Sequence, residues 1–244
     1  MKLDPRFLQA GDQSVIVEFG DEINLIANQC VHELVAAIDG SEVLGLVDVV
    51  PSYRSLLVNY DVRITSRVDL QRTLSQFILE AGNRSAARKR IIHIPTLYGG
   101  DYGPDLDMLS ETVSMSPDDV VQIHSTQEYL VYMIGFTPGF PYLGGLDKRI
   151  KAVRRKSPRS HVPAGSVGIA EEQTGVYPIN SPGGWNIIGR TPLLLFDPTR
   201  KNPSLITSGD YVVFTPLEDE AEYLKLQKEV KIDEYVLNTV TENV

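Results

Sequence analysis

The part of the chain beyond Glu128 consists of short β-rich runs separated by glycine and proline, and this pattern limits the fold more than any other feature. β-Branched and aromatic residues favour strands, whereas glycine and proline mark turns. Short strands at such spacing are typical of a closed or nearly closed, mainly-β barrel with long loops. We predict strands at Glu128–Ile134, Val162–Ala170, Gly175–Ile179, Trp185–Ile188, Leu193–Phe196 and Tyr211–Thr215.

The N-terminal part has a different pattern, in which strands alternate with amphipathic helices. A β-rich run, Ser14–Phe19, precedes a helix that we expect to begin at an N-cap, Asp21, and to end at Gly40. Further strands are predicted at Val43–Val50 and Arg54–Tyr60. Apolar residues recur every three or four positions in both helices, namely Ile23, Ile26, Ala27, Cys30, Leu34, Val35 and Ile38, then Leu70, Leu74, Phe77, Ile78 and Ala81. The order β-α-β-β-α predicts a ferredoxin-like α+β domain.

A polar, basic segment without periodicity, residues 82–90, is the best candidate for a linker. We therefore predict an N-terminal domain over residues 1–85, with Gly82 closing its second helix, and a barrel domain over residues 86–244. The strand Ile91–Thr96 is assigned to the second domain. Ser116 and the proline after it predict a helix start, and the acidic tail from Glu218 predicts a surface helix that frays at its end.

The composition is that of an ordinary globular protein, with 42% hydrophobic and 23% charged residues. A net charge of −9 disfavours nucleic acid or an anionic membrane as the main partner. Cys30 is the only cysteine, which excludes an intrachain disulfide and a cysteine metal cage and fits a reducing cytosol. The first residues contain no apolar signal segment, and no run approaches 18 apolar residues. We expect a cytoplasmic protein.

The segment Gly135–Gly145 (GFTPGFPYLGG) is the densest in glycine, proline and aromatic residues. Glycine allows close approach of the backbone, proline stiffens the chain, and aromatic rings offer flat binding area. The segment is predicted to be neither a helix nor a regular strand. One interpretation makes it the wall of a binding pocket; the other makes it a structural loop that packs its rings against an end of the barrel.

The segment Lys148–Arg159 carries seven basic residues out of twelve in an otherwise acidic chain. Such a cluster can hold phosphate, carboxylate or an acidic partner surface. A solvated charged loop is the commoner explanation. Arg159 is the best exception because it leads directly into a predicted strand, and we expect Arg159→Ala to abolish turnover without unfolding the chain.

The run Gly165–Gly168 comes one residue short of the nucleophile-elbow pattern around Ser166. An elbow needs a strand-to-helix turn and a later histidine, whereas strand-like residues follow Ser166 and no histidine lies beyond His161. A serine triad is therefore disfavoured. A ligand oxygen bound by the Ser166 hydroxyl or by nearby backbone N–H groups is the better hypothesis.

The segment Gln173–Pro192 contains Tyr177, Trp185 and Arg190 around a tight Pro-Gly-Gly turn. These three side chains are candidates for a second wall facing a planar or anionic ligand. A barrel hairpin with a core tryptophan explains the same residues equally well.

Other sites of known pattern are missing from the sequence. It contains no P-loop, and its four histidines are scattered without metal-ligand spacing. Asp101 and Asp105 could join a magnesium–phosphate site, although capping of turns is the commoner role of such aspartates.

Several motifs together resemble one family in order and spacing. These are YGGDYGPDL (98–106), GFTPGFPYLGGL (135–146), PRSHVPAGSVGIA (158–170), QTGVYP (173–178) and SPGGWNIIGRTPLLLFD (181–197). They resemble the family of 5-oxoprolinase B subunits, also known as the KipI family and formerly as allophanate hydrolase subunit 1. The resemblance implies an α+β N-terminal domain and a cyclophilin-like barrel.

The resemblance also implies a function. Members act with a C-type partner and a third, A-type subunit to open 5-oxoproline to glutamate with ATP, and Mg²⁺ is expected with the nucleotide but no prosthetic group. No catalytic base can be assigned. The residues carried over by motif to a substrate or nucleotide site are Phe136, Gly139, Phe140, Tyr142, Arg159, Gly165, Ser166, Gln173, Tyr177, Trp185 and Arg190.

The sequence departs from the family pattern in two places. Val153 precedes Arg154 where a Pro-Arg pair is usual, and Glu171-Glu172 stands where a glycine is usual. The same family also implies a competing function, because some members inhibit a sensor histidine kinase through the N-terminal domain without any turnover. A cyclophilin-type prolyl isomerase is a third hypothesis that rests on fold analogy alone.

Overall fold

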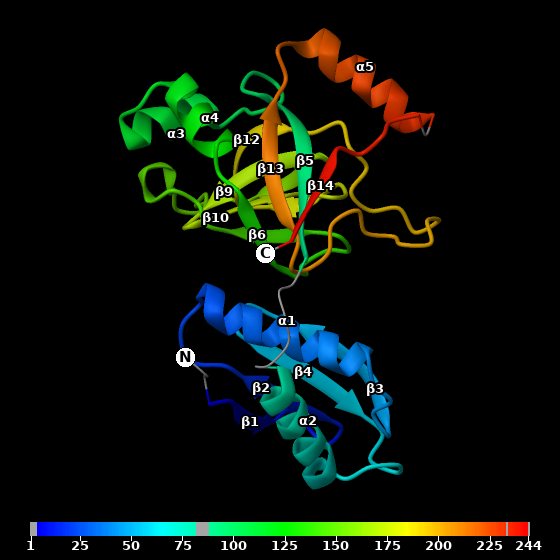
Figure 1. The fold of residues 1–244 in the computed structure, drawn as a ribbon. Coiled ribbons are helices and arrows are strands. Elements are labelled where there is room, and N and C mark those ends of the chain that lie inside the picture. The colour runs from blue at the N-terminus through cyan, green and yellow to red at the C-terminus, as the bar shows by residue number, and fades with distance from the viewer. Residues whose placement is uncertain (1–3, 82–87, 233, 244) are drawn as a thin grey trace. The chain divides into compact units, whose positions relative to one another are not determined.

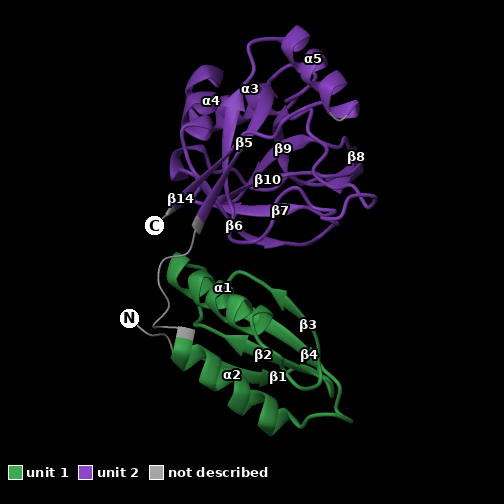
Figure 2. Cartoon of the chain, turned by 45° about the vertical axis from the view of Figure 1, so that its right-hand side comes forward, with its two compact units in different colours: residues 1–87 green, residues 88–244 purple. Residues whose placement is uncertain are grey.

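A computed structural model describes residues 4–81, 88–232 and 234–243. The chain divides into two compact units, Met1–Ala87 and Arg88–Val244 (Figure 2). The predicted boundary between residues 85 and 86, the helix stop at Gly82 and most of the predicted linker lie outside the described residues.

Unit 1 is a four-stranded antiparallel sheet with two helices (Figure 1). Valines and leucines at alternate positions of the strands pack with the helices in one core, since successive residues of a strand face opposite sides. The predicted order β-α-β-β-α is confirmed, but an additional strand, β1, precedes it and lies beside β2 at the sheet edge. The more specific ferredoxin-like assignment stays a prediction. The sheet order is β1-β2-β4-β3, with β1 Arg6–Gln9, β2 Ser14–Glu18, α1 Leu25–Asp39, β3 Leu46–Pro51, β4 Ser55–Tyr60 and α2 Arg67–Ala81.

The predicted start of α1 is wrong. The N-cap is Asn24, whose Oδ1 accepts a hydrogen bond from the Ala27 amide at 2.8 Å, while Asp21 pairs with an arginine of β1. Because the helix begins at Leu25, Ile23 precedes it, and Ile23 and Ile26 are about half exposed rather than buried. The stop at Gly40 is confirmed, because its amide donates to the Ala36 carbonyl.

Unit 2 contains a closed β-barrel of seven strands in the order β12-β9-β10-β7-β6-β13-β5. The ring closes where Gly189 and Arg190 of β12 pair with Tyr98 and Leu97 of β5. The predicted barrel is thereby confirmed, and its cyclophilin-like character stays a prediction. A two-stranded ribbon, β8 with β11, is separate from the barrel sheet. The bounds are β5 Arg88–Tyr98, β6 Tyr129–Ile134, β7 Pro141–Gly144, β8 Arg159–Val162, β9 Ser166–Ala170, β10 Gln173–Val176, β11 Ser181–Gly183, β12 Asn186–Arg190, β13 Tyr211–Pro216 and β14 Thr239–Asn243.

Short helices accompany the barrel: α3 Leu106–Val113, α4 Pro117–Ser125, the 3₁₀ turn η1 Lys148–Ile150 and α5 Glu220–Lys231. The predicted start of α4 is confirmed as a capping box, in which the Ser116 hydroxyl and the Asp119 carboxylate exchange hydrogen bonds with each other's backbone amides. Helix α3 was not predicted. Within the described ranges, no helix combines the length and apolar character needed to cross a bilayer.

Four sequence predictions for unit 2 need correction. The run 162–170 is two strands, β8 and β9, because a turn with Gly165 at a φ of +82° separates them. Residues 193–196 form no strand; Leu193 and Leu195 are buried while Leu194 is exposed, and only an isolated bridge from Phe196 to Ser204 forms. The glycine-rich loop contains a regular strand, β7. The tail is not helical to its end, because residues 239–243 form β14, which pairs with β5 (red beside green in Figure 1).

Candidate functional site

Most of the predicted aromatic residues gather in one cluster outside the barrel core. Phe140, Tyr177 and Trp185 are buried together, with Tyr142 half-buried at their side. Successive residues of β9 face opposite sides, so Ile169 belongs to the barrel interior, whereas Ala170 belongs to this cluster. We call the cluster formed by Phe140, Tyr142, Val162, Ala170, Tyr177, Trp185 and Ile187 the outer-face cluster.

Two glycines allow the Trp185 side chain to pack closely against the strands. A Cβ at Gly175 would lie 3.0 Å from Cζ3 of Trp185, and one at Gly168 would lie 3.2 Å from its Cβ. The indole therefore lies close against the strands, and Phe140 meets it edge-on with ring centroids 5.4 Å apart. Phe140, Tyr177 and Trp185 are at most 5% exposed, so packing positions them. Tyr142 keeps part of its ring accessible.

The loop before β7 holds Phe136 in an unfavourable backbone conformation. Its φ is +66°, and the amide of Thr137 donates to the carbonyl of Gly135 at 2.8 Å, which makes Phe136 the centre of a strained γ-turn. The Phe136 ring is 62% exposed and stands edge-on to Phe140 at 5.6 Å. Gly139 has a φ of +81°, and a Cβ there would lie 2.9 Å from Phe196. Strain that presents an exposed aromatic ring is typical of a binding site.

Ser166 lies beside the outer-face cluster. The Tyr177 amide donates to the Ser166 carbonyl at 2.9 Å on one side, and Arg190 is its register partner on the other. The side chain is fully buried, yet its Oγ has no hydrogen-bond partner among the described residues. Gly165 must be glycine, because its φ is +82° and a Cβ would lie 2.3 Å from the Thr191 carbonyl oxygen. Since Ser166 opens a strand and not a helix, the nucleophile elbow is absent.

Arg190 lies over the ring of Tyr102, with its guanidinium carbon 5.3 Å from the ring centroid. One Nη donates to the Asp101 carbonyl at 3.4 Å, and its Nε has no partner in the described part of the chain. Tyr102 is itself held by α5, because its hydroxyl donates to Glu220 at 2.8 Å. Gln173, the first residue of β10, lies opposite Ala170 of the outer-face cluster.

Arg159 is occupied by a buried ion pair. Both of its Nη atoms donate to Asp105, at 2.7 and 2.8 Å, and Arg155 adds a third bond at 2.7 Å. Asp105 is 3% exposed and also accepts from the Ile187 amide at 2.7 Å. These hydrogen bonds raise the pKa of Arg159. Asp105 makes no capping bond with its side chain, so the expected capping role is wrong. The expectation that Arg159→Ala leaves folding intact stays untested, but the loss of two of these bonds gives a reason to expect destabilisation as well.

Sequence reasoning missed Arg154. Its neighbours are fixed, because the Asn186 side chain donates to the Val153 carbonyl at 3.0 Å and the Arg155 amide donates to the Gly184 carbonyl at 2.8 Å. The Arg154 side chain is exposed. The sequence does mark Arg154 as the arginine of the altered Pro-Arg pair. Within the basic run, however, no local pattern separates it from the neighbouring arginines.

His124 is a second residue that sequence reasoning missed, and it belongs to the barrel interior. Its Nδ1 lies 2.8 Å from the Tyr98 hydroxyl and its Nε2 lies 2.8 Å from the Thr174 hydroxyl. Thr174 donates in turn to the Gly168 carbonyl at 3.0 Å. Complete burial lowers the pKa of His124 to about 3, so the imidazole is neutral. A neutral, fully bonded histidine is a structural element of the core.

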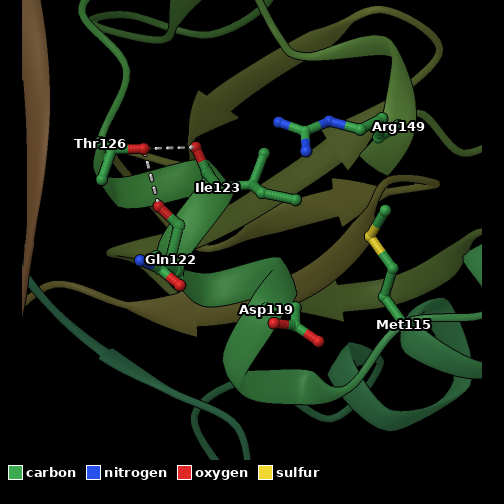
Figure 3. A pocket seen from close by; sticks show the side chains of 6 residues that line it. All are labelled: Met115, Asp119, Gln122, Ile123, Thr126 and Arg149. Carbon is green, nitrogen blue, oxygen red and sulfur yellow. Dashed lines mark hydrogen bonds between the residues drawn. The ribbon is translucent and has the colours of Figure 1, made fainter.

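A cavity of about 420 Å³ lies along α4 (Figure 3). The charged groups at its rim already have partners: Arg149 pairs with Asp147 at 2.7 Å, and Asp119 belongs to the capping box of α4. The cavity contains none of the site residues carried over by motif, and Arg149 is its one lining residue from the basic segment Lys148–Arg159. It is lined by Met115, Asp119, Gln122, Ile123, Thr126 and Arg149.

Metal ligands do not cluster in the described part of the chain, where no three His, Cys, Asp or Glu side chains lie close enough to hold an ion. The chemistry that the residues at the outer-face cluster can offer a ligand therefore consists of hydrogen-bond donors, cations and aromatic surface. We place the candidate site at the outer-face cluster with Phe136, Ser166 and Arg190 around it.

Comparison with known proteins gives the family. The model of the carboxyltransferase domain, subdomains C and D, matches residues 5–206. The chain is 43% identical over 222 residues to the B subunit of 5-oxoprolinase from Bacillus subtilis, covering 87% of this chain and 92% of that protein. The chain belongs to the family of 5-oxoprolinase B subunits. The Escherichia coli O157:H7 member is 37% identical over 209 residues, covering 86% of this chain and 94% of that protein.

Solved structures of this fold include longer chains. The crystal structure of TTHA0988 is 35% identical with a TM-score of 0.76, and it matches 85% of this chain, which spans 40% of that protein. The urea amidolyase of K. lactis has a TM-score of 0.80 at 20% identity, matching 99% of this chain and 16% of its own length. The latter shows the likeness of fold alone.

Proposed function

We propose that this chain is the B-type subunit of an ATP-dependent 5-oxoprolinase, a hydrolase that opens 5-oxoproline to L-glutamate and is active only with its partners. The single observation that carries the proposal is the near full-length similarity to named 5-oxoprolinase B subunits. The gathering of most motif residues around the outer-face cluster supports the same function. The proposed partners are a homologue of the C-type 5-oxoprolinase subunit and a third, A-type subunit.

The chemistry follows from the stability of the lactam. Transfer of the γ-phosphoryl group of ATP to the amide oxygen, with release of ADP, would make the ring carbon electrophilic. Water then adds to that carbon, and the carbon–nitrogen bond breaks as the nitrogen takes a proton, which leaves an acyl phosphate. A second water hydrolyses the acyl phosphate to glutamate and phosphate. The additions of water develop negative charge on oxygen, which positioned donors stabilise.

The described residues can supply part of this site. The Ser166 hydroxyl is a buried donor without a partner among the described residues, and Arg190, its register partner on β12, carries a cation that can bind a carboxylate or phosphate oxygen. The accessible part of Tyr142 and the exposed ring of Phe136 offer flat surface to a planar ring. No carboxylate cage for Mg²⁺ exists among the described residues, so in this proposal the ion comes with the nucleotide. The partner subunits supply the catalytic base.

The test is phosphate release by the three purified subunits, measured with and without 5-oxoproline. We expect 5-oxoproline to stimulate release, and omission of this chain to abolish the stimulation. If the complete mixture releases no phosphate when 5-oxoproline is added, the proposed function is wrong.

A second candidate function, inhibition of a sensor histidine kinase, is favoured by one feature of unit 1. Register places Leu8, Ile16, Leu57 and Val50 side by side across its sheet, on the face opposite to the core residues. Leu8 and Val50 are 42% and 44% exposed, and an exposed apolar row is typical of a protein contact. Under this hypothesis the full chain slows kinase autophosphorylation, Val50→Lys removes the effect, and the exposed Val153→Lys in unit 2 keeps it. Equal rates with and without the chain would exclude this candidate.

A further inference from the structure

The basic segment before β8 divides its arginines between two different roles. Arg155 and Arg159 share Asp105, and their side chains are only 29% and 27% exposed. Arg154 lies between anchored backbone groups but has an exposed side chain. Among the described residues no carboxylate pairs with it. Two arginines of the segment therefore hold the fold, whereas Arg154 has no counter-charge among the described residues.

The position of Arg154 relates it to the outer-face cluster. The hydrogen bonds on either side of it run to Gly184 and Asn186, so Arg154 is held beside the Trp185 segment. Burial raises the pKa of the Tyr142 and Tyr177 hydroxyls, and the nearby Arg154 guanidinium opposes that shift in both. The geometry agrees, because the anchored backbone at Arg154 lies beside the Trp185 segment and the Trp185 ring lies 6.1 Å from the Tyr142 ring, centroid to centroid. Tyr142 is only half-buried.

We propose that Arg154 and the half-buried ring of Tyr142 form an oxyanion-binding subsite at the rim of the outer-face cluster, which takes a carboxylate or a phosphate group. A guanidinium presents paired donors that match the two oxygens of such a group. The adjacent aromatic ring supplies a flat apolar wall for the rest of the ligand.

The subsite would give the proposed function a specific anion contact. It rests on the proposed function only for the identity of the ligand. The carboxylate of 5-oxoproline and the phosphates of ATP are the two sources of the same chemistry. Ser166 accepts the Tyr177 amide through its carbonyl and pairs in register with Arg190, so Arg154 adds a second arginine to the candidate site.

The experiment is calorimetric titration of the isolated full-length chain with sodium phosphate, ATP and L-5-oxoproline in separate runs. Lys156→Gln is the matched control, because Lys156 is an exposed cation two residues away and its loss changes the net charge equally. We expect Arg154→Gln to weaken binding of the recognised anion by at least about tenfold, Arg154→Lys by less, and Lys156→Gln by no more than about twofold. All three variants should melt within a few degrees of the wild type, since Arg154 makes no buried pair.

The three probes distinguish the sources of the anion. If phosphate and ATP bind but 5-oxoproline does not, the subsite belongs to the nucleotide. If 5-oxoproline binds but phosphate and ATP do not, it belongs to the substrate carboxylate. The proposal is overturned if none of the probes binds the wild type, or if Arg154→Gln binds them as the wild type does. A reconstituted enzyme that shows no turnover would contradict the proposed function only, because these titrations use the isolated chain and would still decide the subsite.

Discussion

The interior of the barrel and its outer face bury polar groups in opposite ways, although both use residues of the same strands. In the interior, both ring nitrogens of His124 have partners, and the Thr174 hydroxyl donates to a carbonyl as well. On the outer face, the Ser166 hydroxyl and the Arg190 Nε are buried without a partner among the described residues. A buried polar group without a partner destabilises a fold. The interior is therefore built for stability, and the outer face keeps donors for a ligand.

The largest effect expected from this comparison is acid destabilisation through the interior. His124 has a pKa of about 3 in the folded chain, below its ordinary value of 6.5. Because the folded pKa is the lower one, its contribution to stability is complete above pH 6.5 and is lost as the pH falls toward 3. The free energy of unfolding should fall by up to about 4 kcal/mol from this group.

Urea unfolding between pH 8 and pH 4 measures this effect. His124→Gln should be less stable than the wild type at pH 8 but should depend less on pH. His161→Gln is the control, because His161 is exposed and its loss should leave the wild-type profile. Parallel profiles for the wild type and His124→Gln would show that the interior histidine does not titrate as described.

A somewhat smaller effect is expected at the ion pair beneath the outer face. Asp105→Asn leaves Arg155 and Arg159 facing each other without their shared carboxylate, which should cost about 3 kcal/mol of unfolding free energy. Asp147→Asn is the matched control, because its partner Arg149 is 60% exposed and such a pair contributes about 1 kcal/mol or less. Both values come from denaturant unfolding at pH 7. Equal losses in the two variants would remove Asp105 from its structural role.

The smallest effect tests the strain at Phe136. Phe136→Ala and Phe136→Gly both remove the exposed ring, but only glycine adopts a φ of +66° without strain. The glycine variant should therefore be the more stable of the two by about 1 kcal/mol, the reverse of the order at ordinary positions. Thermal unfolding of the pair measures the difference, and a more stable alanine variant would contradict the strain.

The sequence predicts the strands better than their ends and turns. Alternating apolar residues identify β2, β4, β6 and β13 within about one residue, because local pattern and burial agree there. The turn at Gly165 was missed because valine stands on both sides of it, so the run reads as continuous β-structure. Helix α3 was missed because eight residues are too few to show a clear period.

The candidate site could be predicted from its residues but not from their roles. Glycine, proline and aromatic motifs mark the segments that form the outer-face cluster, because tight turns and close ring packing need those residue types. The pairing of Arg159 with Asp105 joins residues 54 positions apart and cannot be seen in a local pattern. For the same reason Arg154 was indistinguishable from the paired arginines next to it.

The contrast between Ser166 and Thr174 tests the central claim most directly. Phosphate release stimulated by 5-oxoproline should be measured in the three-subunit mixture with Ser166→Ala and with Thr174→Val, alongside the stability of each variant. Ser166→Ala should lose at least about tenfold in rate while remaining as stable as the wild type, because the hydroxyl has no partner among the described residues. Thr174→Val should lose about 1–3 kcal/mol of stability and keep its rate per folded molecule. Full activity in Ser166→Ala, together with lost activity in a folded Thr174→Val, would contradict a functional outer face.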